Sequence, residues 1–441
     1  MSRDLVSADH PFGPQTLAFG VFSTDANAPR VGVRLGDDVI DVSTLAGAAG
    51  REDLAAAWAT PSLNAFLALG HEVWADARAW LTETLGAAVE GADDRRAIPS
   101  NWVSSVQPDG VAGEGAGAGA GVDALAAHRH SLEDVTLHLP IEVADYVDFY
   151  ASAHHASNVG KIFRPDNAAL PPNWKHLPIG YHGRAGTVVV DGTDITRPTG
   201  QRKAPADPAP TFGPSIRLDI EAELGYVVGG ATTMGSRVSV DEAAQHIFGV
   251  VILNDWSARD IQAWEYVPLG PFLGKSFGTS ISAWVTPLAA FDSARVALPR
   301  EEGDPEVLDY LRGGEGDGVG AAFGLDIHVE VSLNGTVISR PENRDMYWSP
   351  AQMLAHMTVN GASLRNGDLF GSGTISGAEK PTRGSLLELS WSGTEPLTLD
   401  DGSTRGFLED GDTVTMTAWA PGPDGTRVGL GQVSGTITPA T

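Results

Sequence analysis

The sequence of 441 residues contains no cysteine, which excludes disulfides, thiolate catalysis and Cys-based zinc or iron–sulfur sites. Basic residues are scarce, with 29 Lys and Arg against 56 Asp and Glu and a net charge of -27. We therefore expect neither nucleic acid nor an anionic membrane as a partner, because their phosphates would repel the chain. No apolar run reaches the roughly 18 residues of a membrane span, and no signal-peptide pattern is present. The cytoplasm is the expected location.

What the chain does contain points to a turn-rich protein with a sizeable core. Hydrophobic residues make up 42% of the sequence, and there are 53 Gly and 28 Pro. Frequent turn residues between short apolar segments are typical of β-rich folds. The length favours about two to three domains. We therefore predict a mostly β (α+β) protein.

The N-terminal part shows strand and then helix patterns. Strands are expected at 17–22, 30–35 and 39–42, with a hairpin turn at 36–38. Residues 51–86 are expected to be helical, and the candidate packing residues there are Trp58, Phe66, Leu69, Trp74 and Trp80. A Gly/Ala-rich run at 109–127 is typical of a linker. The predicted division is an N-terminal domain at 1–108, a linker at 109–135 and a catalytic domain at 136–441.

The C-terminal part is expected to be mainly strands. These lie at 186–190, 215–228, 247–253, 281–285, 325–332, 385–391 and 413–419. Helices are expected at 241–246, 256–266 and 349–358, and residues 303–323 have the Gly and Asp content of a surface loop.

Acidic residues on one expected strand could bind a metal ion. Apolar and polar residues alternate from Ile216 to Leu224, which places Glu221 and Glu223 on the same side, about 7 Å apart. Two Glu side chains at this spacing can converge on one cation. The alternative is an ordinary solvated face of an antiparallel strand.

A further carboxylate strengthens the metal hypothesis. Asp255 follows the continuous apolar run 247–253, and a carboxylate at the end of a buried strand is either a helix N-cap or a site residue. Asp148 is a weaker candidate because its segment shows no clear period. If these acids meet, their repulsion requires a cation. An all-oxygen ligand set favours Ca²⁺ or Mg²⁺ over Zn²⁺.

The helix expected after Asp255 carries hydrogen-bond donors on one face. Arg259, Gln262 and Tyr266 stand at i, i+3 and i+7, whereas Ile261 and Trp264 could pack on the opposite side. A solvated stripe is the alternative interpretation. The following segment, 267–278, is apolar and turn-rich and contains Lys275, which indicates a loop lining a site.

One histidine has candidate partners. His155 lies near Asp148, Tyr150, Asn158 and Arg164 in the sequence. A general base needs a group to orient its second ring nitrogen, and Glu388 fits because it is the only charge in the apolar segment 384–391. The sequence alone does not pair the two. No Gly-x-Ser-x-Gly elbow is present, so activated water is the preferred nucleophile.

Taken together, these segments resemble the fumarylacetoacetate hydrolase family. The resemblance runs from residue 20 to about residue 412. Its most specific motifs are LPIGYHGR at 177–184, NDWSARDIQ at 254–262, WEYVPLGPFLGKSFGT at 264–279 and SGTISG at 372–377.

The resemblance implies a fold and an assembly. The family has a small N-terminal SH3-like β-barrel, followed by a catalytic domain with a mixed β-roll or β-sandwich architecture, and it forms homodimers. It also implies hydrolysis of a C–C bond in 4-fumarylacetoacetate, the last step of tyrosine and phenylalanine degradation.

The resemblance further implies a role for each matching site residue. Ca²⁺ or Mg²⁺ would be held by Asp148, Glu221, Glu223 and Asp255, with Lys275 and Thr279 near a second ion. His155 would be the base and Glu388 its orienter, and the oxyanion would be stabilised by Arg259, Gln262 and Lys275. The substrate contacts would be Tyr150, Arg164, Tyr181, Arg259, Gln262, Tyr266 and Thr374.

Two alternatives stay open from the sequence. One is a related diketo-acid enzyme that works as an acylpyruvate hydrolase, an isomerase or a decarboxylase. The other is a Ca²⁺-stabilised β-rich binding protein that uses some of the 11 Trp to contact a ligand.

Overall fold

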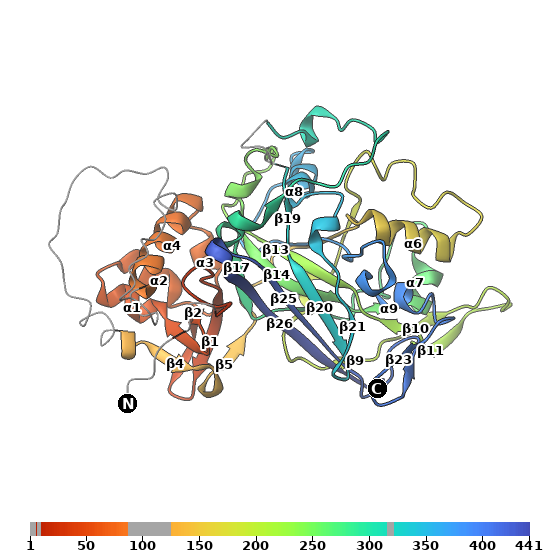
Figure 1. The fold of residues 1–441 in the computed structure, drawn as a ribbon, viewed down its shortest axis with the longest axis horizontal. Coiled ribbons are helices and arrows are strands. Elements are labelled where there is room, and N and C mark those ends of the chain that lie inside the picture. The colour runs from red at the N-terminus through yellow and green to blue at the C-terminus, as the bar shows by residue number, and fades with distance from the viewer. Residues whose placement is uncertain (1–5, 7–9, 87–124, 315–321) are drawn as a thin grey trace.

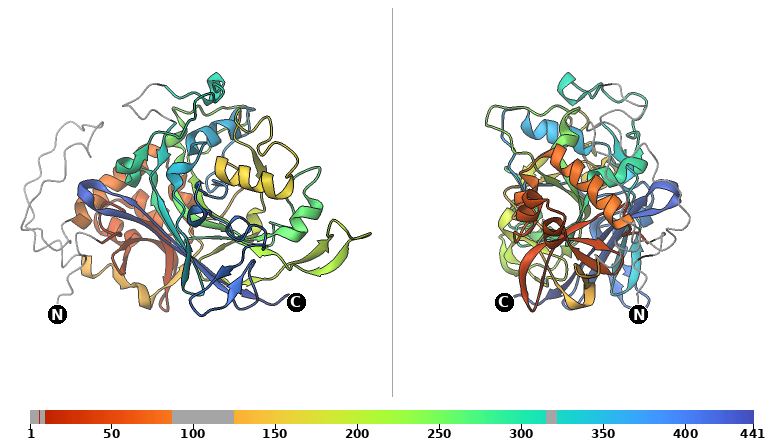
Figure 2. Two further views of the ribbon diagram at one scale, coloured as in Figure 1. Left: turned by 45° about the vertical axis from the view of Figure 1, so that its right-hand side comes forward. Right: turned by 90° about the vertical axis from the view of Figure 1, so that its left-hand side faces the viewer.

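The computed structural model describes residue 6 and residues 10–86, 125–314 and 322–441. Most of the predicted Gly/Ala linker and residues 315–321 of the predicted loop lie outside these ranges. Figures 1 and 2 show the N-terminal strands and helices as a lobe beside a larger body. The lobe's first strands, close to those predicted, are β1 (Phe19–Thr24), β2 (Asn27–Leu35) and β3 (Asp38–Asp41). The predicted turn is confirmed, and Gly36 adopts a positive φ of 63° there.

The predicted helical region is divided into separate helices. They are α1 (Val42–Ala48), α2 (Glu52–Trp58), α3 (Asn64–Leu67) and α4 (His71–Gly86). Trp58, Phe66 and Trp74 are buried, as predicted, and Trp80 is partly buried. The prediction for Leu69 is wrong. This side chain is 38% exposed because it lies in the turn between α3 and α4, where Gly70 has a φ of +83°.

The N-terminal lobe is continuous with the main sheet of the larger body. β1 pairs with β17 (Trp284–Pro287), and Phe248 of the larger body packs against Phe66 and Trp74 at ring-centroid distances of 5.6 and 5.3 Å. Two short strands beyond residue 108, β4 (Arg129–Ser131) and β5 (Thr136–His138), pair with β3 and β1. The lobe therefore includes residues that the predicted division gave to the linker and the catalytic domain. The SH3-like barrel and the exact division stay predictions.

The main sheet crosses the centre of the larger body. Its order continues β1-β17-β14-β13-β22-β6-β7, with β16 and β8 branching from β14. Most neighbours are antiparallel, but β22 with β6 and β16 with β8 are parallel. The strands are β6 (Tyr146–Phe149), β7 (Gly180–His182), β8 (Val188–Val190), β13 (Ala222–Val228), β14 (Ile247–Asp255), β16 (Thr279–Ile281) and β22 (Leu369–Gly371).

A second sheet packs against the first. Its order is β21-β20-β25-β26-β9, and Figure 1 shows β25 and β26 running alongside β13 and β14. The strands are β9 (Ile195–Thr196), β20 (His328–Leu333), β21 (Thr336–Ser339), β25 (Thr413–Pro421) and β26 (Arg427–Thr438). Side chains from both sheets, such as Val250, Ile252, Val331 and Met416, share one buried core. The mostly β prediction is confirmed.

Shorter elements complete the larger body. The short strand pairs in the described part of the chain are β10 (Thr199–Arg202) with β11 (Thr211–Pro214), β12 (Leu218–Asp219) with β15 (Ser257–Ala258), β18 (Arg295–Val296) with β19 (Gly324–Leu325), and β23 (Leu397–Thr398) with β24 (Thr404–Arg405). The helices are α6 (Ala153–Phe163), α7 (Arg259–Glu265), α8 (Pro350–Thr358) and α9 (Leu386–Leu389). Among the described residues, no helix is both long and apolar enough to cross a membrane.

Three local predictions differ from the structure. The predicted strand at 385–391 is instead the short helix α9, because Ser385 caps its N-terminus by accepting from the N–H of Glu388. Only a 3₁₀ turn, Ala243–Gln245, forms within 241–246. Helix α6 follows the N-cap Ser152 in a segment for which no helix was predicted.

The predicted alternating strand from Ile216 to Leu224 is also interrupted. Its residues divide between β12 and β13, and the N–H of Glu221 donates to the Asn254 side chain, at 3.2 Å, between the two strands. The prediction that one face of this segment is apolar and the other polar and exposed is also wrong. Residues 218–228 are buried on both sides, whereas Ile216 is 70% exposed.

Candidate active site

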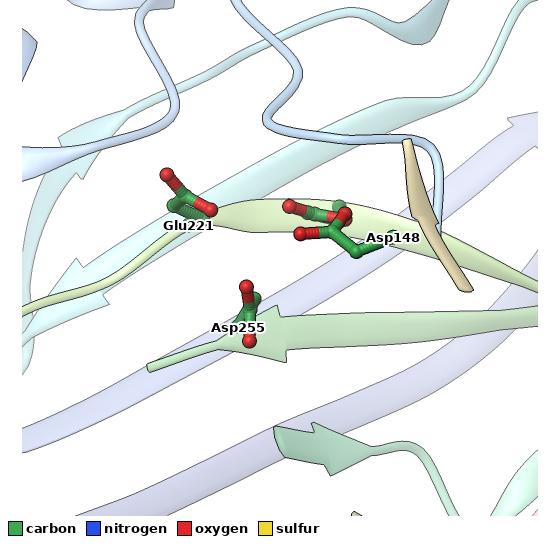
Figure 3. Close-up of side chains that lie close together, drawn as sticks. Asp148, Glu221 and Asp255 are labelled. Atoms are coloured by element: carbon green, nitrogen blue, oxygen red, sulfur yellow. The ribbon is translucent and has the colours of Figure 1, made fainter. Parts of the chain in front are cut away.

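Four buried acids come together at neighbouring strands of the main sheet. Asp148 lies on β6, Glu223 on β13 and Asp255 at the end of β14, whereas Glu221 directly precedes β13. Each offers one carboxylate oxygen, and these oxygens all lie within 4.8 Å of one another. Figure 3 shows the side chains of Asp148, Glu221 and Asp255 around a common space. Their burial excludes the alternative of a solvated strand face.

The backbone leaves room for this cluster at one glycine. Gly371 on β22 pairs with Gly225 of β13 on one side and with Asp148 of β6 on the other. A Cβ atom at Gly371 would lie 2.9 Å from Oε2 of Glu223 and 3.4 Å from Oδ1 of Asp148. Any larger residue would therefore compete with the acids for space.

The acids have the properties of a divalent-cation site. Burial raises the pKa of Asp148, Glu223 and Asp255, and the neighbouring carboxylates add to the rise. Within the described part of the chain, Oδ1 of Asp148 and Oε1 of Glu223 have no hydrogen-bond partner. A buried acceptor without a donor is costly. A cation would satisfy these oxygens and offset the repulsion, so the residues fit a metal ion.

Lys275 already balances part of this negative charge. Its Nζ donates to Glu221 and to Asp255. Burial would lower the pKa of Lys275, but the facing carboxylates raise it above its usual value. A protonated Nζ has no lone pair for a metal ion. Thr279 donates from Oγ1 to Oδ1 of Asp255 at 3.2 Å. The metal contacts expected for Lys275 and Thr279 stay predictions.

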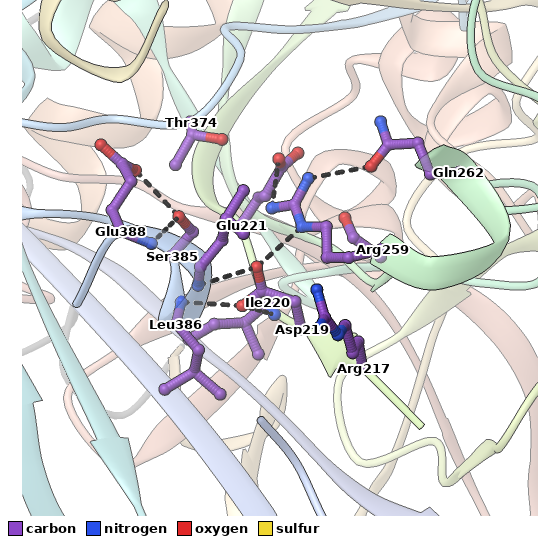
Figure 4. Close-up of polar contacts among 12 residues, drawn as sticks. Arg217, Asp219, Ile220, Glu221, Arg259, Gln262, Thr374, Ser385, Leu386 and Glu388 are labelled. Carbon is purple, nitrogen blue, oxygen red and sulfur yellow. Dashed lines mark hydrogen bonds and ion pairs between the residues drawn. The ribbon is translucent and has the colours of Figure 1, made fainter. Parts of the chain in front are cut away.

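Arg259 connects the acid cluster to helix α7. Its Nη2 donates to Oε1 of Glu221 at 2.7 Å, its Nε to Oδ2 of Asp219 at 2.8 Å and its Nη1 to Oε1 of Gln262 at 3.1 Å (Figure 4). Burial would raise the pKa of Glu221, but the charges of Lys275 and Arg259 hold it well below its usual range. The structure thus keeps Glu221 ionised.

A buried His–Glu pair stands beside the acids. Nδ1 of His155, on α6, lies 2.6 Å from Oε2 of Glu388, on α9. On the other side of the ring, Nε2 lies 3.2 Å from Oγ1 of Thr374 and 3.7 Å from Oε1 of Glu221. The structure therefore joins two residues that sequence analysis could name but not pair.

Hydrogen bonds from three further residues hold Glu388 in its ionised form. Asn158 donates to Oε1 at 2.9 Å, and Ser376 and Ser385 donate to Oε2 at 2.9 and 2.8 Å. Burial would raise the pKa of Glu388, but His155, Asn158 and Ser385 lower it. A carboxylate in this position fixes the tautomer and orientation of the imidazole.

One cavity of ≈ 460 Å³ contacts both parts of the site. Its lining includes His155 of the pair and Asp148, Glu221 and Lys275 of the acid cluster. All the residues predicted to contact substrate also line it, namely Tyr150, Arg164, Tyr181, Arg259, Gln262, Tyr266 and Thr374. Asp255 and Thr279 instead face a smaller cavity of ≈ 120 Å³ that shares Tyr181 and Lys275 with the first.

Two features next to the cavity differ from the sequence interpretation. Ile261 packs in the core as predicted, but the packing prediction for Trp264 is wrong. The residue is 41% exposed, and its Nε1 donates to Gln201 of β10. Sequence analysis also missed the polar supports of the site, Asp219, Ser376 and Ser385. Ser385 carried a signal, because a Ser three residues before a Glu is a capping pattern.

Family comparisons match most of the chain. The fumarylacetoacetate (FAA) hydrolase C-terminal family matches residues 145–438, and the fumarylacetoacetase N-terminal family matches residues 15–107. The chain belongs to the fumarylacetoacetate hydrolase family. Both matches agree with the resemblance noted in the sequence, and the four acids and the His–Glu pair all lie within the C-terminal match.

Members of this family align with the chain end to end. Fumarylacetoacetase of Rattus norvegicus is 42% identical over 451 residues, covering 100% of this chain and 99% of the relative. The Homo sapiens enzyme is 42% identical over 454 residues with the same coverage, and the Arabidopsis thaliana enzyme is 42% identical over 447 residues, covering 99% and 97%.

A solved structure of a family member supports the fold. Fumarylacetoacetate hydrolase from Exiguobacterium antarcticum superposes with a TM-score of 0.51 at 16% identity, covering 96% of this chain and 99% of that chain.

Proposed function

We propose that this chain is a metal-dependent hydrolase that cleaves 4-fumarylacetoacetate to fumarate and acetoacetate, the last step of tyrosine and phenylalanine degradation. The observation that carries the proposal is that one cavity is lined by the His155 side chain of the His–Glu pair, by part of the acid cluster and by the positively charged side chains of Arg259 and Lys275. The end-to-end identity with fumarylacetoacetases supports the choice of substrate.

The acid cluster is proposed to hold Ca²⁺ or Mg²⁺ through Asp148, Glu221, Glu223 and Asp255. Oxygen ligands of this kind suit both hard cations. When bound, the ion supplies positive charge that polarises the diketone oxygens of the substrate. Lys275 and Thr279 are proposed to lie near a second divalent ion.

His155 is the proposed general base. Because Nδ1 donates to Glu388, Nε2 keeps its lone pair and faces the cavity side, where Thr374 lies. A water molecule placed at Nε2 loses a proton to the ring, and its oxygen attacks the fumaryl carbonyl carbon. The charge of Glu388 stabilises the resulting imidazolium.

Three residues are proposed to donate to the oxyanion. Gln262 accepts from Arg259 through its carbonyl, so its NH₂ group stays free to donate. Arg259 has five N–H groups and uses three in the bonds described, and Lys275 uses two of three. Each residue therefore keeps a donor for the substrate. Such donors act strongly because they are fixed before the reaction begins.

The C–C bond then breaks as the tetrahedral intermediate collapses. The oxyanion reforms a carbonyl, which gives the carboxylic acid of fumarate, and this acid ionises to the carboxylate. The bonding electrons pass to acetoacetate as its enolate, which takes up a proton. The protonated His155 is the nearby acid for this step. Arg164, Tyr150, Tyr181, Tyr266 and Thr374 are proposed to hold the substrate's carboxylates and carbonyls.

The assembly and location are also proposals. We propose a homodimer, because the loop beside the cavity exposes large apolar side chains that include Val267, Leu269 and Phe272. We retain the cytoplasm as the predicted location. Light scattering of the purified protein tests the first proposal, and cell fractionation tests the second.

The loss of diketo-acid absorbance on adding the purified protein tests the activity. We expect 4-fumarylacetoacetate to disappear, with equimolar fumarate and acetoacetate formed. Chelation should stop the reaction, and Ca²⁺ or Mg²⁺ should restore it. A folded, metal-loaded protein that leaves this substrate intact but cleaves an acylpyruvate, or that decarboxylates or isomerises a related diketo acid, would contradict the proposal.

A further inference from the structure

One buried carboxylate close to the site has no role in the mechanism above. Asp219 lies at the end of β12 and is 0% exposed. Its oxygens are not among those of the acid cluster, although Glu221 is only two residues away. Four donors surround its carboxylate, and they come from three different parts of the chain. Figure 4 shows this arrangement.

The first set of contacts reaches the proposed oxyanion donor. Oδ2 of Asp219 accepts from Nε of Arg259 at 2.8 Å. The two Nη atoms of the same guanidinium donate to Glu221 and to Gln262. Because the guanidinium is planar, bonds at Nε and at both Nη atoms fix its plane and its position along the cavity wall.

The second set of contacts is with helix α9, which carries Glu388, the partner of the proposed base His155. Oδ1 of Asp219 accepts from the N–H of Leu386 at 2.7 Å, and Oδ2 accepts from the N–H of Leu387 at 3.1 Å. These are the first two helical residues of α9. The N–H of the third, Glu388, donates to Oγ of Ser385. The N–H groups of a first helical turn have no partners within the helix. Asp219 therefore anchors the turn from which Glu388 reaches His155.

The backbone fixes Asp219 itself. It pairs with Ser257 of β15, the strand that leads into Arg259, and its Oδ1 also accepts from the N–H of Ile220 at 2.8 Å. The carboxylate thus has neither rotational freedom nor access to solvent. Any shift of Asp219 displaces Arg259 and α9 together.

We propose that Asp219 is a positioning residue. It fixes the position of the oxyanion donor Arg259 relative to the Glu388–His155 pair. This inference rests on the proposed function, because those two groups act in one reaction there. Asp219 is not among the residues that line the substrate cavity or form the acid cluster, so we infer that it acts through its hydrogen-bonded neighbours.

The test replaces Asp219 with Asn, which keeps the size and removes the charge. An amide offers one acceptor oxygen, so its NH₂ group must face either Arg259 or the N–H groups of α9. We expect kcat to fall about 10- to 100-fold, since a displacement of about 1 Å has an effect of that size. KM should change less than about threefold, because the lost interaction matters mainly in the transition state. Ca²⁺ affinity should change less than kcat, because Asp219 reaches the acid cluster only through the bond between Arg259 and Glu221.

Asp41 provides a matched control in the N-terminal lobe. It is also buried, accepts from Nε of Arg30 at 2.6 Å and caps helix α1 by accepting from the N–H of Thr44 at 3.1 Å. Asp41→Asn should lower the Tm and leave kcat per folded molecule unchanged. If Asp219→Asn behaves in the same way, Asp219 is merely structural and the inference is wrong.

A double variant tests the path of the effect. Because Asp219 acts partly through Glu388, the fall in kcat caused by Asp219→Asn should be smaller in a Glu388→Gln background than in the parent. Multiplication of the two effects would overturn the proposed coupling. If Asp219→Asn does not fold, Asp219→Glu is measured in its place. It keeps the charge but moves the carboxylate by one methylene, so the same fall in kcat is expected.

A measurement without substrate separates this inference from the proposed function. The proton between His155 and Glu388 should give a low-field NMR resonance, assigned by its loss in His155→Ala. We expect Asp219→Asn to shift or broaden it and Asp41→Asn to leave it unchanged. A shift in a protein that does not cleave 4-fumarylacetoacetate would refute the function and keep the positioning role. An unchanged resonance together with an unchanged kcat would overturn the inference.

Discussion

Replacing Glu388 with Gln tests the core of the proposed mechanism, because the change keeps the shape of the side chain. Among the described residues, Oε2 of Glu388 accepts from His155, Ser376 and Ser385, whereas Oε1 accepts from Asn158 alone. The carbonyl oxygen of Gln is therefore expected at the Oε2 position. Its NH₂ group then faces the NH₂ group of Asn158, which places two donors against each other.

Two losses follow from this geometry. The imidazolium of His155 loses a charged hydrogen-bond partner, an effect of about 1.5–3 kcal/mol, and the facing donors leave a buried polar group unsatisfied at a cost of about 1–3 kcal/mol. At about 1.4 kcal/mol for each factor of ten, the loss at the imidazolium corresponds to a fall in kcat of about 10- to 100-fold. The unsatisfied group is present before and during the reaction, so its cost lowers the stability of the folded protein and not kcat.

The assay is steady-state cleavage of 4-fumarylacetoacetate with saturating Ca²⁺, together with the Tm of each variant. Glu395→Gln serves as a surface control because Glu395 is exposed and pairs with the partly exposed Lys380. We expect the control to match the parent and KM to change little in Glu388→Gln. A folded Glu388→Gln variant with kcat within about threefold of the parent would refute the assignment of Glu388 as the orienter of the base.

Three further outcomes are expected. Glu223→Gln should remove most of the rise in Tm caused by Ca²⁺, because binding stabilises only a folded site, and a full rise would exclude Glu223 as a ligand. Trp58→Ala should destabilise the N-terminal lobe by about 3–5 kcal/mol in denaturant titrations, since Trp58 is fully buried there; a loss under about 1 kcal/mol would contradict this packing. Burial raises the pKa of Asp368 from 3.8 to about 6, so its contribution to stability is complete below the unfolded pKa and is lost as pH rises through about 6. Asp368→Asn should therefore raise the Tm more at pH 8 than at pH 5, and an equal change at both would argue against the shifted pKa.

The sequence was sufficient to predict the β-rich fold and to name the residues around the cavity. Continuous apolar runs such as 247–253 predicted buried strands, because only a strand covered on both faces tolerates them. Asp255 was identified for a similar reason, whereas Glu221 and Glu223 were identified by their two-residue spacing and Asp148 mainly by the family resemblance. A carboxylate next to such a run must be capped, paired or bound to a cation, and the structure brings Asp148, Glu221, Glu223 and Asp255 together.

The sequence was not sufficient where long-range contacts decide the local structure. Residues 385–391 have an apolar strand pattern, yet Asp219 and Ser385 bind the free N–H groups of a helical turn there. The pairing of His155 with Glu388 spans 233 residues and depends on that turn. Similarly, the alternation from Ile216 to Leu224 ends where Asn254 bonds the backbone of Glu221. None of these contacts has a periodic signature.

Cleavage of 4-fumarylacetoacetate in ¹⁸O-labelled water tests the central claim most directly, because the proposed mechanism fixes where the oxygen goes. Attack by His155-activated water on the fumaryl carbonyl should place one ¹⁸O in the new carboxylate of fumarate for each bond broken, with acetoacetate as the other product. Mass spectra of products quenched early in the reaction report this. Fumarate without label, or malonate in place of acetoacetate, would contradict the proposed attack.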